Sequence, residues 1–331
     1  MAMTLVEASK YSNDVLQRGV IELLVKDDPI LEPLPFKNIK GNGLTYNQET
    51  TLSGASFYEV GDTWVESTSV VGQATANTRI LGGDADVDNY LEETRGDQQG
   101  LMAEQIVAKT KAIKRSYLDA FFYGYRTGGV TKDFDGLQYL VRRTDTGSSN
   151  TIAVATSSGT GLLLSLERAE AAKDLVKHEE PQLCVMSKYM RRSINKYLNG
   201  VGGITKTEVQ GKSVQTLADI PVVVSDHIRN NESADLQYGT NEASAAVYGH
   251  NYADTDGEDD DSSTTIFFLR LAPEAVCGIQ SGGPINTVRI GDLETKDAKR
   301  VRIRWYPGLM FQNLVMCSKV TGILPSGTVT A

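Results

Sequence analysis

One long amphipathic segment, residues 97–125, constrains the fold of this chain more than any other part of its sequence. Apolar side chains recur there at helical spacing, at Met102, Ile106, Ile113, Tyr117, Phe121 and Tyr125, and the stripe is widened by Val107, Leu118 and Phe122. This period predicts a helix with one broad buried side. At about 1.5 Å per residue the helix is roughly 40 Å long, more than twice the usual length in globular domains. Such a helix must cross a whole domain or serve as a strut.

Both ends of the predicted helix carry residues that favour a stop. Asp97 is placed to cap the free backbone N–H groups of the first turn. Gly124, Gly128 and Gly129 favour a turn at the other end. The flank between these ends carries a group of basic residues: Lys109, Lys111, Lys114 and Arg115.

Residues 38–78 have a different character, with glycines separating short runs rich in Thr, Val and Tyr. Such runs predict a long two-stranded hairpin. It has few large apolar residues beyond Phe57, Tyr58 and Trp64. A hairpin this polar cannot build its own core, so we expect it to lie on another surface, most naturally another subunit. A helical pattern at 4–26, closed by prolines, also lacks a local partner for its apolar face.

The rest of the chain mixes helical and strand patterns without βαβ repeats, which favours the α+β class. Helices are predicted at 162–178 and 187–198, and strands at 80–87, 183–186, 220–225, 245–248, 265–270, 273–277 and 287–289. Alternating apolar residues at 299–307 and 309–321 predict an antiparallel pair. Residues 147–161, rich in Ser, Thr and Gly, predict a loop.

Composition excludes several functional classes. The 331 residues are 40% hydrophobic, enough for one large domain or two. A net charge of −9 argues against a protein that wraps nucleic acid over its whole surface, although a basic inner face remains compatible with it. Cys184, Cys277 and Cys317 are widely separated, which predicts buried reduced thiols. No secretory signal and no run of about 18 apolar residues is present, so we expect no membrane span and synthesis in a cytoplasm.

Three motif-like segments fail their own spacing rules. Residues 211–213, Gly-Lys-Ser, lack the earlier glycine of a phosphate-binding loop, because Lys206 stands at that position. The acidic run at 254–261 does not match a calcium-binding loop and is expected to be a solvated surface loop. The histidines, His178, His227 and His250, have no metal-binding or nucleophile spacing. We therefore predict no catalytic, cofactor-binding or metal-binding residues, and a protein that is not an enzyme.

The order of elements resembles that of the HK97-type major capsid proteins of tailed bacteriophages, over nearly the whole chain. Residues 97–124 followed by Phe134-Asp135-Gly136-Leu137 are similar to the spine helix of that family and the turn after it. Residues 81–87, Leu-Gly-Gly-Asp-Ala-Asp-Val, are similar to the strand that precedes the spine. The resemblance implies an HK97-like capsid fold with the following division of the chain: an N-terminal arm at 1–37, an E-loop hairpin at 38–78, a peripheral domain at 79–145 and 285–331 around the spine helix at 97–125, and an axial domain at 146–284.

The resemblance also implies a function. Copies of the chain would assemble into hexamers and pentamers of an icosahedral virion shell that encloses double-stranded DNA, formed in the host cytoplasm without a membrane. Partners would be the chain itself, a portal, a separate scaffolding protein, a cement protein, and DNA through non-specific contacts. Only about 37 residues precede the hairpin, so a fused scaffold is not expected. Residues 41–77 contain no lysine, so a covalent cross-link from the hairpin is not expected.

Two sets of residues are candidates for contacts with neighbouring subunits or DNA in the assembled shell. Phe57, Tyr58 and Trp64 would anchor the hairpin on a neighbour, because aromatic groups dominate interface energetics; local packing of Trp64 is the alternative. The basic flank, from Lys109 to Arg115, would face packaged DNA or a neighbour. Two other functions stay open: an encapsulin-type protein compartment of the same fold that holds an enzyme cargo, and a cytosolic hydrolase of unknown type.

Overall fold

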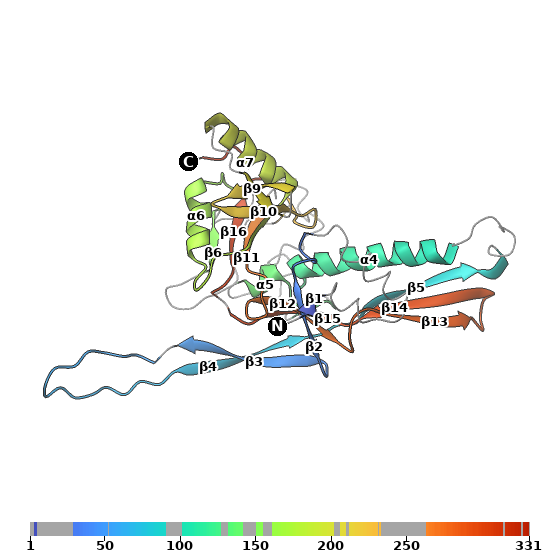
Figure 1. Cartoon of the computed structure of the whole chain (residues 1–331), viewed down its shortest axis with the longest axis horizontal. Coiled ribbons are helices and arrows are strands. Elements are labelled where there is room, and N and C mark those ends of the chain that lie inside the picture. The colour runs from blue at the N-terminus through green and yellow to red at the C-terminus, as the bar shows by residue number, and fades with distance from the viewer. Residues whose placement is uncertain are drawn as a thin grey trace, which may run out of the picture.

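The computed structural model describes residues 3–4, 29–51, 53–90, 101–126, 132–141, 150–154, 161–201, 206–209, 212–230, 232, 263–313, 315–325 and 327–330. The cap at Asp97, the strand at 245–248 and the acidic run at 254–261 lie outside these residues, as does the helix predicted at 4–26 apart from Thr4, which is in a strand. The described part is elongated: one region stands on a long base, and a hairpin projects from the end of that base (Figure 1).

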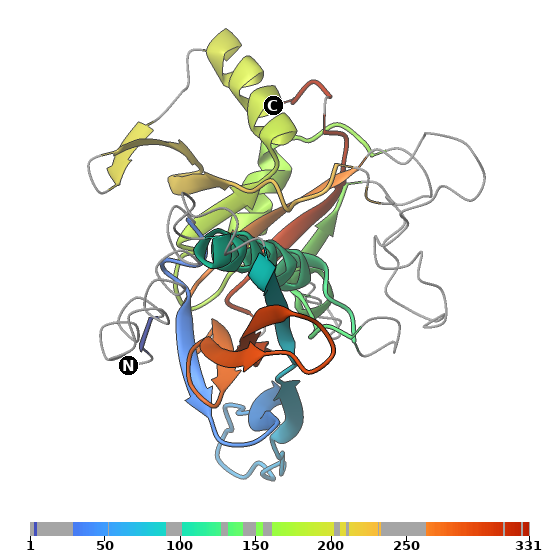
Figure 2. The same cartoon turned by 90° about the vertical axis from the view of Figure 1, so that its right-hand side faces the viewer.

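The base is built around the predicted long helix. Helix α4 spans Leu101–Tyr123 and packs on a three-stranded sheet of order β13-β14-β5. The strands are β5 (Leu81–Asp88), β13 (Asn286–Asp292) and β14 (Ala298–Trp305). Both pairings in this sheet are antiparallel. The long helix is therefore confirmed over 101–123, and Figure 2 looks along it, with these strands on one side and the standing region on the other.

Period-two alternation explains how this sheet meets the helix. On β14, Val301, Ile303 and Trp305 are buried, while the residues between them face away. On α4, Ile106, Ile113, Tyr117 and Phe121 are buried in the same cluster. The ring centroids of Tyr117 and Trp305 lie 4.7 Å apart. The predicted apolar stripe is therefore buried inside the chain, except that Val107 is exposed.

The turn after α4 depends on two glycines that bring backbones into contact. Gly136 donates its N–H to the carbonyl of Gly124 at 2.7 Å. A Cβ on Gly136 would lie 2.5 Å from the Ala120 carbonyl oxygen, and one on Gly124 would lie 2.1 Å from the Phe134 oxygen. No other residue type fits this approach. The short helix α5 (Leu137–Leu140) follows at once.

The standing region holds a seven-stranded sheet of order β6-β16-β11-β7-β10-β9-β8. Its strands are β6 (Thr151–Ala153), β7 (Leu183–Met186), β8 (Lys206–Val209), β9 (Lys212–Leu217), β10 (Ile220–Val224), β11 (Thr264–Leu269) and β16 (Ser318–Ile323). Strands β7 and β10 are parallel, and β11 is antiparallel to β7. Helices α6 (Leu166–Asp174) and α7 (Lys188–Val201) bury Ala169, Ala172, Met190 and Ile194 in the core of this region.

A four-stranded sheet of order β1-β2-β12-β15 lies beside the helix. It contains β1 (Met3–Thr4), β2 (Pro35–Ile39), β12 (Val276–Ser281) and β15 (Pro307–Phe311). Phe36 of β2 contacts both Tyr117 and Trp305, with ring centroids 6.2 and 5.8 Å away. This sheet thus joins the core of the base.

Several predicted elements need correction. The antiparallel pair at 299–307 and 309–321 is wrong: β14 pairs with β13 and β5, β15 pairs with β12, and β16 pairs with β11 and β6. Alternation identifies a buried face but not the strand beside it, and the chain changes sheets after Trp305. The helix predicted at 162–178 is shorter, because Leu162 bridges to Ile323 instead. The second helix runs past Gly200 to Val201, and the strand expected at 273–277 begins at Val276. Strands β1, β2, β6, β8 and β9 were not predicted.

The predicted boundary between the axial and peripheral domains lies at residue 285, and strands from both sides of it share sheets. Strand β16, at 318–323, lies in the seven-stranded sheet, and β12, at 276–281, pairs with β15 beside the base. The division into peripheral and axial domains at that residue stays a prediction.

Candidate assembly surfaces

The root of the predicted hairpin is fixed to the rest of the chain. Strands β3 (Gly43–Thr51) and β4 (Val70–Asn77) pair antiparallel from Gly43↔Asn77 outward, as predicted. The Tyr46 hydroxyl donates to the Phe311 carbonyl at 3.0 Å, and burial raises the pKa of this phenol. Leu44 and Tyr46 pack on a cluster of Ile39, Ala76, Cys277, Ile279 and Met310.

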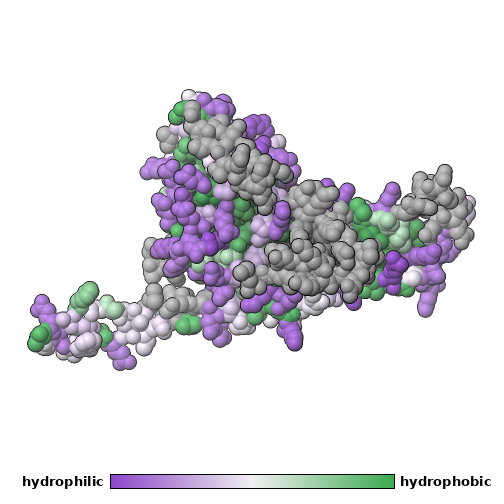
Figure 3. Space-filling view, viewed as in Figure 1, coloured by the Kyte–Doolittle hydropathy of each residue, from purple (hydrophilic) through white to green (hydrophobic). Residues whose placement is uncertain are grey.

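The tip of the hairpin, residues 53–69, has no such support. Phe57 and Val60 are fully exposed, and Trp64 is 80% exposed. The rings of Tyr58 and Trp64 stack with centroids 4.7 Å apart, and the Val65 N–H donates to the Tyr58 hydroxyl at 3.1 Å. Figure 3 shows green, hydrophobic side chains on this far end of the molecule beside purple, hydrophilic ones.

A tight turn forms the end of the tip. The Glu59 N–H donates to Asp62 Oδ2 at 2.7 Å, and the Asp62 N–H donates to the Glu59 carbonyl at 3.1 Å. Gly61 has a φ of +101°, a conformation that glycine adopts without strain. Val60 is thus held outward between two acidic residues. The tip contains three acidic residues, Glu59, Asp62 and Glu66, and no Lys or Arg.

The three predicted interface residues, Phe57, Tyr58 and Trp64, therefore lie together at the tip. Trp64 stacks on Tyr58 but belongs to no buried cluster of the described residues. Both readings of Trp64 are partly met: it packs locally, and it still offers most of its surface to another molecule. Their role as anchors stays a prediction.

The four basic residues of α4 do not share one environment. Lys111 and Arg115 are exposed and four residues apart, so they lie on one side of the helix. Lys109 is half-buried, and its stem lies over β5, because a Cβ on Gly83 would be 2.8 Å from Lys109 Cδ. Lys114 is half-buried as well. A common role for the four residues stays a prediction.

The face of the three-stranded sheet away from α4 carries two bidentate ion pairs that sequence reasoning missed. Arg302 donates from Nε and Nη2 to the two oxygens of Asp84 at 2.7 and 2.8 Å. Arg300 donates in the same way to Asp86, at 2.6 Å for both bonds. Hydrogen bonding from Arg302 lowers the pKa of Asp84, and hydrogen bonding from Arg300 lowers that of Asp86. The sequence shows that the two aspartates, like the two arginines, are two residues apart. It does not show that β5 lies beside β14, which brings them together.

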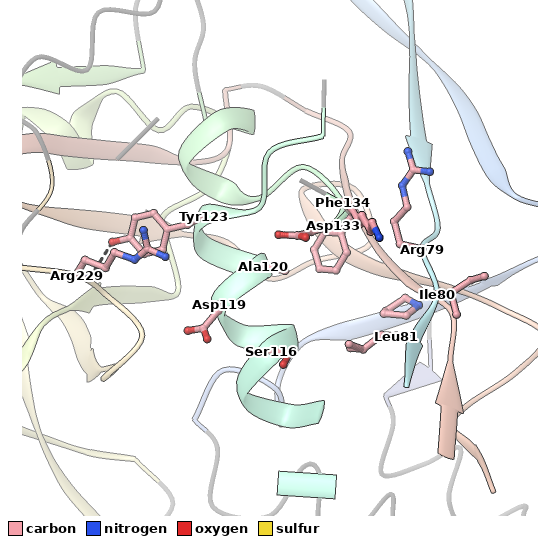
Figure 4. A pocket seen from close by; sticks show the side chains of 12 residues that line it. Arg79, Ile80, Leu81, Ser116, Asp119, Ala120, Tyr123, Asp133, Phe134 and Arg229 are labelled. Atoms are coloured by element: carbon pink, nitrogen blue, oxygen red, sulfur yellow. Dashed lines mark hydrogen bonds between the residues drawn. The ribbon is translucent and has the colours of Figure 1, made fainter. Parts of the chain in front are cut away.

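A cavity of about 390 Å³ opens where the hairpin root meets α4 (Figure 4). One wall is apolar and consists of Ile80, Leu81, Ala120, Phe134 and Pro307. Charged side chains surround this wall: Arg79, Lys132 and Arg229, with Asp119 and Asp133. Figure 4 places Arg79 and Arg229 on opposite sides of the cavity. Sequence reasoning did not find it, because its residues come from five separate segments.

The charged groups around the cavity differ in what they contact. Asp119 bonds to His227 Nδ1 at 2.7 Å. The Arg229 guanidinium lies 4.6 Å from the centre of the Tyr123 ring. Arg79 donates its backbone N–H to Pro307 at 2.8 Å. Its side-chain Nε is buried, yet among the described residues it has no hydrogen-bond partner.

A buried polar network lies behind this cavity. Glu232 is fully buried and accepts hydrogen bonds from the hydroxyls of Tyr123 and Thr265. Burial raises the pKa of Glu232 to about 7, although these bonds and the charges of Lys319 and Arg229 oppose the rise. Buried Lys319 donates to the Gln138 carbonyl at 2.5 Å. The network joins the end of α4 to β11 and β16. Its members are far apart in the sequence, so no motif could predict it.

The described residues offer no group of three or more His, Cys, Asp or Glu side chains arranged to hold a metal ion. The thiols of Cys184, Cys277 and Cys317 are buried and free, as predicted, and burial raises the pKa of each, to about 11 for Cys277 and about 12 for Cys317. Within the same residues, every helix is too short or too polar to cross a membrane.

No family model and no curated protein sequence matches this chain. Solved structures do match over most of its length. The holo-SrpI encapsulin of Synechococcus elongatus PCC 7942 is 12% identical, with a TM-score of 0.62, over 90% of this chain and 88% of the other. The capsid of a native GTA particle is 10% identical, with a TM-score of 0.54, over 87% of each chain. A chain of Mycobacterium phage Adephagia is 12% identical, with a TM-score of 0.54, over 90% of this chain and 89% of the other. At such identities the matches establish the fold alone, and the chain accordingly has the α+β, HK97-like fold of capsid shell proteins.

Proposed function

We propose that this chain is the major subunit of an icosahedral bacteriophage capsid that encloses double-stranded DNA. The observation that carries the proposal is the hairpin: its root is fixed to the chain, and its aromatic tip is bare in the isolated subunit. Extended parts without a local core find one through assembly. The likeness of fold to phage capsids supports the same conclusion.

In this proposal the hairpin of each copy lies on a neighbour, and hexamers and pentamers close into a shell. The area buried per subunit would exceed a standard interface of about 1,600 Å². The arm at 1–37, the hairpin at 38–78 and the peripheral and axial domains keep the roles given above. A portal, a separate scaffolding protein and a cement protein complete the proposed partners.

Phe57, Tyr58 and Trp64 are the proposed anchors of the hairpin. Replacing Trp64 with alanine should weaken assembly much more than it weakens folding of the subunit, because Trp64 contributes to no buried cluster of the described residues. Sedimentation of assembled particles and thermal unfolding of the free subunit would measure the two effects. Equal losses in both would place Trp64 in the subunit core.

Lys111 and Arg115 are the stronger candidates for contact with DNA, because Lys109 and Lys114 are half-buried. Contact with the phosphate backbone through such residues would be independent of sequence and weakened by salt.

Electron microscopy of the purified chain tests the proposal. We expect closed shells or rings of five and six copies, and nuclease-protected double-stranded DNA in particles taken from the source organism. A subunit that stays small at all concentrations would contradict the proposal.

A second candidate is an encapsulin-type compartment. The TM-score of 0.62 to the SrpI encapsulin, against 0.54 to the GTA capsid, favours it. Its cavity would hold a protein cargo in place of DNA. Mass spectrometry of the particle contents separates the two: a single co-purifying protein with no protected DNA would select the encapsulin.

A further inference from the structure

No described residue outside the hairpin tip covers it. Seventeen residues separate Val60 from Asn77, and at about 3.3 Å per residue this distance is roughly 50 Å. Among the described residues, each hydrogen bond and ring contact of the tip joins two of its own residues. Figure 1 shows the tip apart from every other labelled element. Within the described part of the chain, Val60 and Phe57 are therefore left open to another molecule.

The cavity at the hairpin root offers a surface of matching chemistry. Ile80, on its apolar wall, is 85% exposed and lies beside a hollow of about 390 Å³. That volume is within the range of ligand-sized pockets, roughly 300–1,000 Å³, so it can take the side chains of a tight turn. Arg79 lines this hollow, and its Nε has no hydrogen-bond partner among the described residues, so no described acceptor competes there for the guanidinium.

Charge points to the same pairing. The turn presents Val60 between the carboxylates of Glu59 and Asp62, and the tip has no positive charge to oppose them. Around the cavity, the positive charges of Arg79, Lys132 and Arg229 outnumber the carboxylates of Asp119 and Asp133. Asp119 is already bonded to His227. An apolar centre with acidic flanks therefore meets an apolar wall with a mainly basic rim.

Other basic surfaces fit the turn less well. On the outer face of the three-stranded sheet, Arg300 and Arg302 already bind Asp86 and Asp84 in bidentate pairs. On α4, Lys109 is covered by β5, and the exposed Lys111 and Arg115 line no part of the cavity.

We propose that the turn Glu59–Asp62 of one copy docks in the root cavity of a second copy, with Val60 against Ile80 and an acidic oxygen at Arg79. The inference rests on the proposed function, since it requires copies to assemble. Tip and cavity are different surfaces of the same chain, so the contact is head-to-tail. Repetition of a head-to-tail contact gives a ring when the rotation closes.

Chemical cross-linking between two single variants tests the contact. Val60→Cys and Ile80→Cys subunits are assembled together and treated with a short bis-maleimide. The native thiols are buried, so the new ones react first. We expect a covalent dimer on a denaturing gel, and none when either variant is assembled alone.

The matched control replaces Ile80→Cys with Ile290→Cys, an exposed isoleucine on β13 away from the cavity. Dimers with the Ile290 variant and none with the Ile80 variant, in normally formed particles, would overturn the docking site while leaving the shell function intact. Failure of every variant and of the native chain to form particles would instead overturn the proposed function.

Charge exchange gives an independent test. Arg79→Glu should raise the protein concentration needed for assembly about tenfold, because it places like charges together. Combining Arg79→Glu with Glu59→Arg should recover most of that loss. Thermal unfolding of each free subunit controls for misfolding. A double variant that assembles no better than the poorer single variant would contradict the pairing.

Discussion

The two ends of the hairpin make opposite use of similar residues. At the root, Tyr46 is partly buried and its hydroxyl is bonded to the chain. At the tip, Tyr58 and Trp64 stack on one another in solvent. Between them the strand pairing shifts its register near Thr51 and then ends, at the pair Thr51↔Val70. The root of the hairpin therefore packs on its own subunit, whereas the tip leaves its aromatic side chains available to a second molecule.

The largest expected effect tests whether stability resides in the base rather than the tip. Tyr117→Ala removes a fully buried ring that contacts Trp305, Phe36 and Phe134. It should lower the free energy of unfolding by about 3–5 kcal/mol, measured by chemical denaturation. The matched tip variant, Phe57→Ala, should change it by less than about 0.5 kcal/mol. Comparable losses of unfolding free energy in the two variants would show that the tip stabilises the subunit as much as the base does.

The buried network predicts a pH effect that belongs to the base alone. Glu232 has a pKa of about 7 when folded, against 4.5 for the free side chain, because burial disfavours its charge. Between these values the folded state holds more protons than the unfolded state, so stability is full below pH 4.5 and falls as pH rises toward 7. The total fall from this group is at most about 3 kcal/mol.

Glu232→Gln should remove this part of the pH dependence, because the amide stays neutral. Denaturation of both proteins from pH 5 to pH 8 measures the difference. Parallel curves for the two proteins would show that Glu232 is not protonated on folding.

The turn after α4 should tolerate no side chain. Gly136→Ala places a Cβ within 2.5 Å of the Ala120 oxygen and 2.7 Å of the Gly124 nitrogen. Because both are backbone atoms, the change should cost about 1–3 kcal/mol of stability. Gly200→Ala is the control: its Cβ meets nothing within 4 Å and lies in α7, so it should be neutral or stabilising. Equal melting temperatures for the two variants would contradict the close approach.

The smallest expected effect concerns the outer face of the sheet. Asp84→Asn removes an exposed ion pair with Arg302, and such pairs contribute little in water. We expect a small loss of stability above the ordinary pKa of an aspartate, which vanishes as pH falls and the carboxylate is protonated, and which shrinks in high salt. A loss as large as that of Gly136→Ala would mean that this face is more than a solvated surface.

Sequence patterns predicted the elements whose formation depends on residues close together in the sequence. Helix α4 follows from the period of its apolar residues, and the hairpin follows from its strand-forming runs. The partners of Trp305 and Val320 did not follow, because alternation marks a buried face and leaves the neighbouring strand open. Glu232 and Tyr123 are 109 residues apart in the sequence. The residues that line the cavity are also distant in the sequence, from Arg79 to Pro307. Sites of that kind become visible only once the chain is folded. The exposed aromatic tip, in contrast, was predictable because it depends on no distant partner.

The position of β16 also bears on how the chain folds as it is made. Residues 318–323 lie between β6, at 151–153, and β11, at 264–269, in the seven-stranded sheet. A nascent chain that has not yet released residues 318–323 from the ribosome leaves β6 and β11 without their shared neighbour. Pairings this distant in sequence form late. Lys319, which reaches the network around Glu232, arrives with the same strand. The standing region and its attachment to the base are thus completed together, once residues 318–323 have joined the sheet.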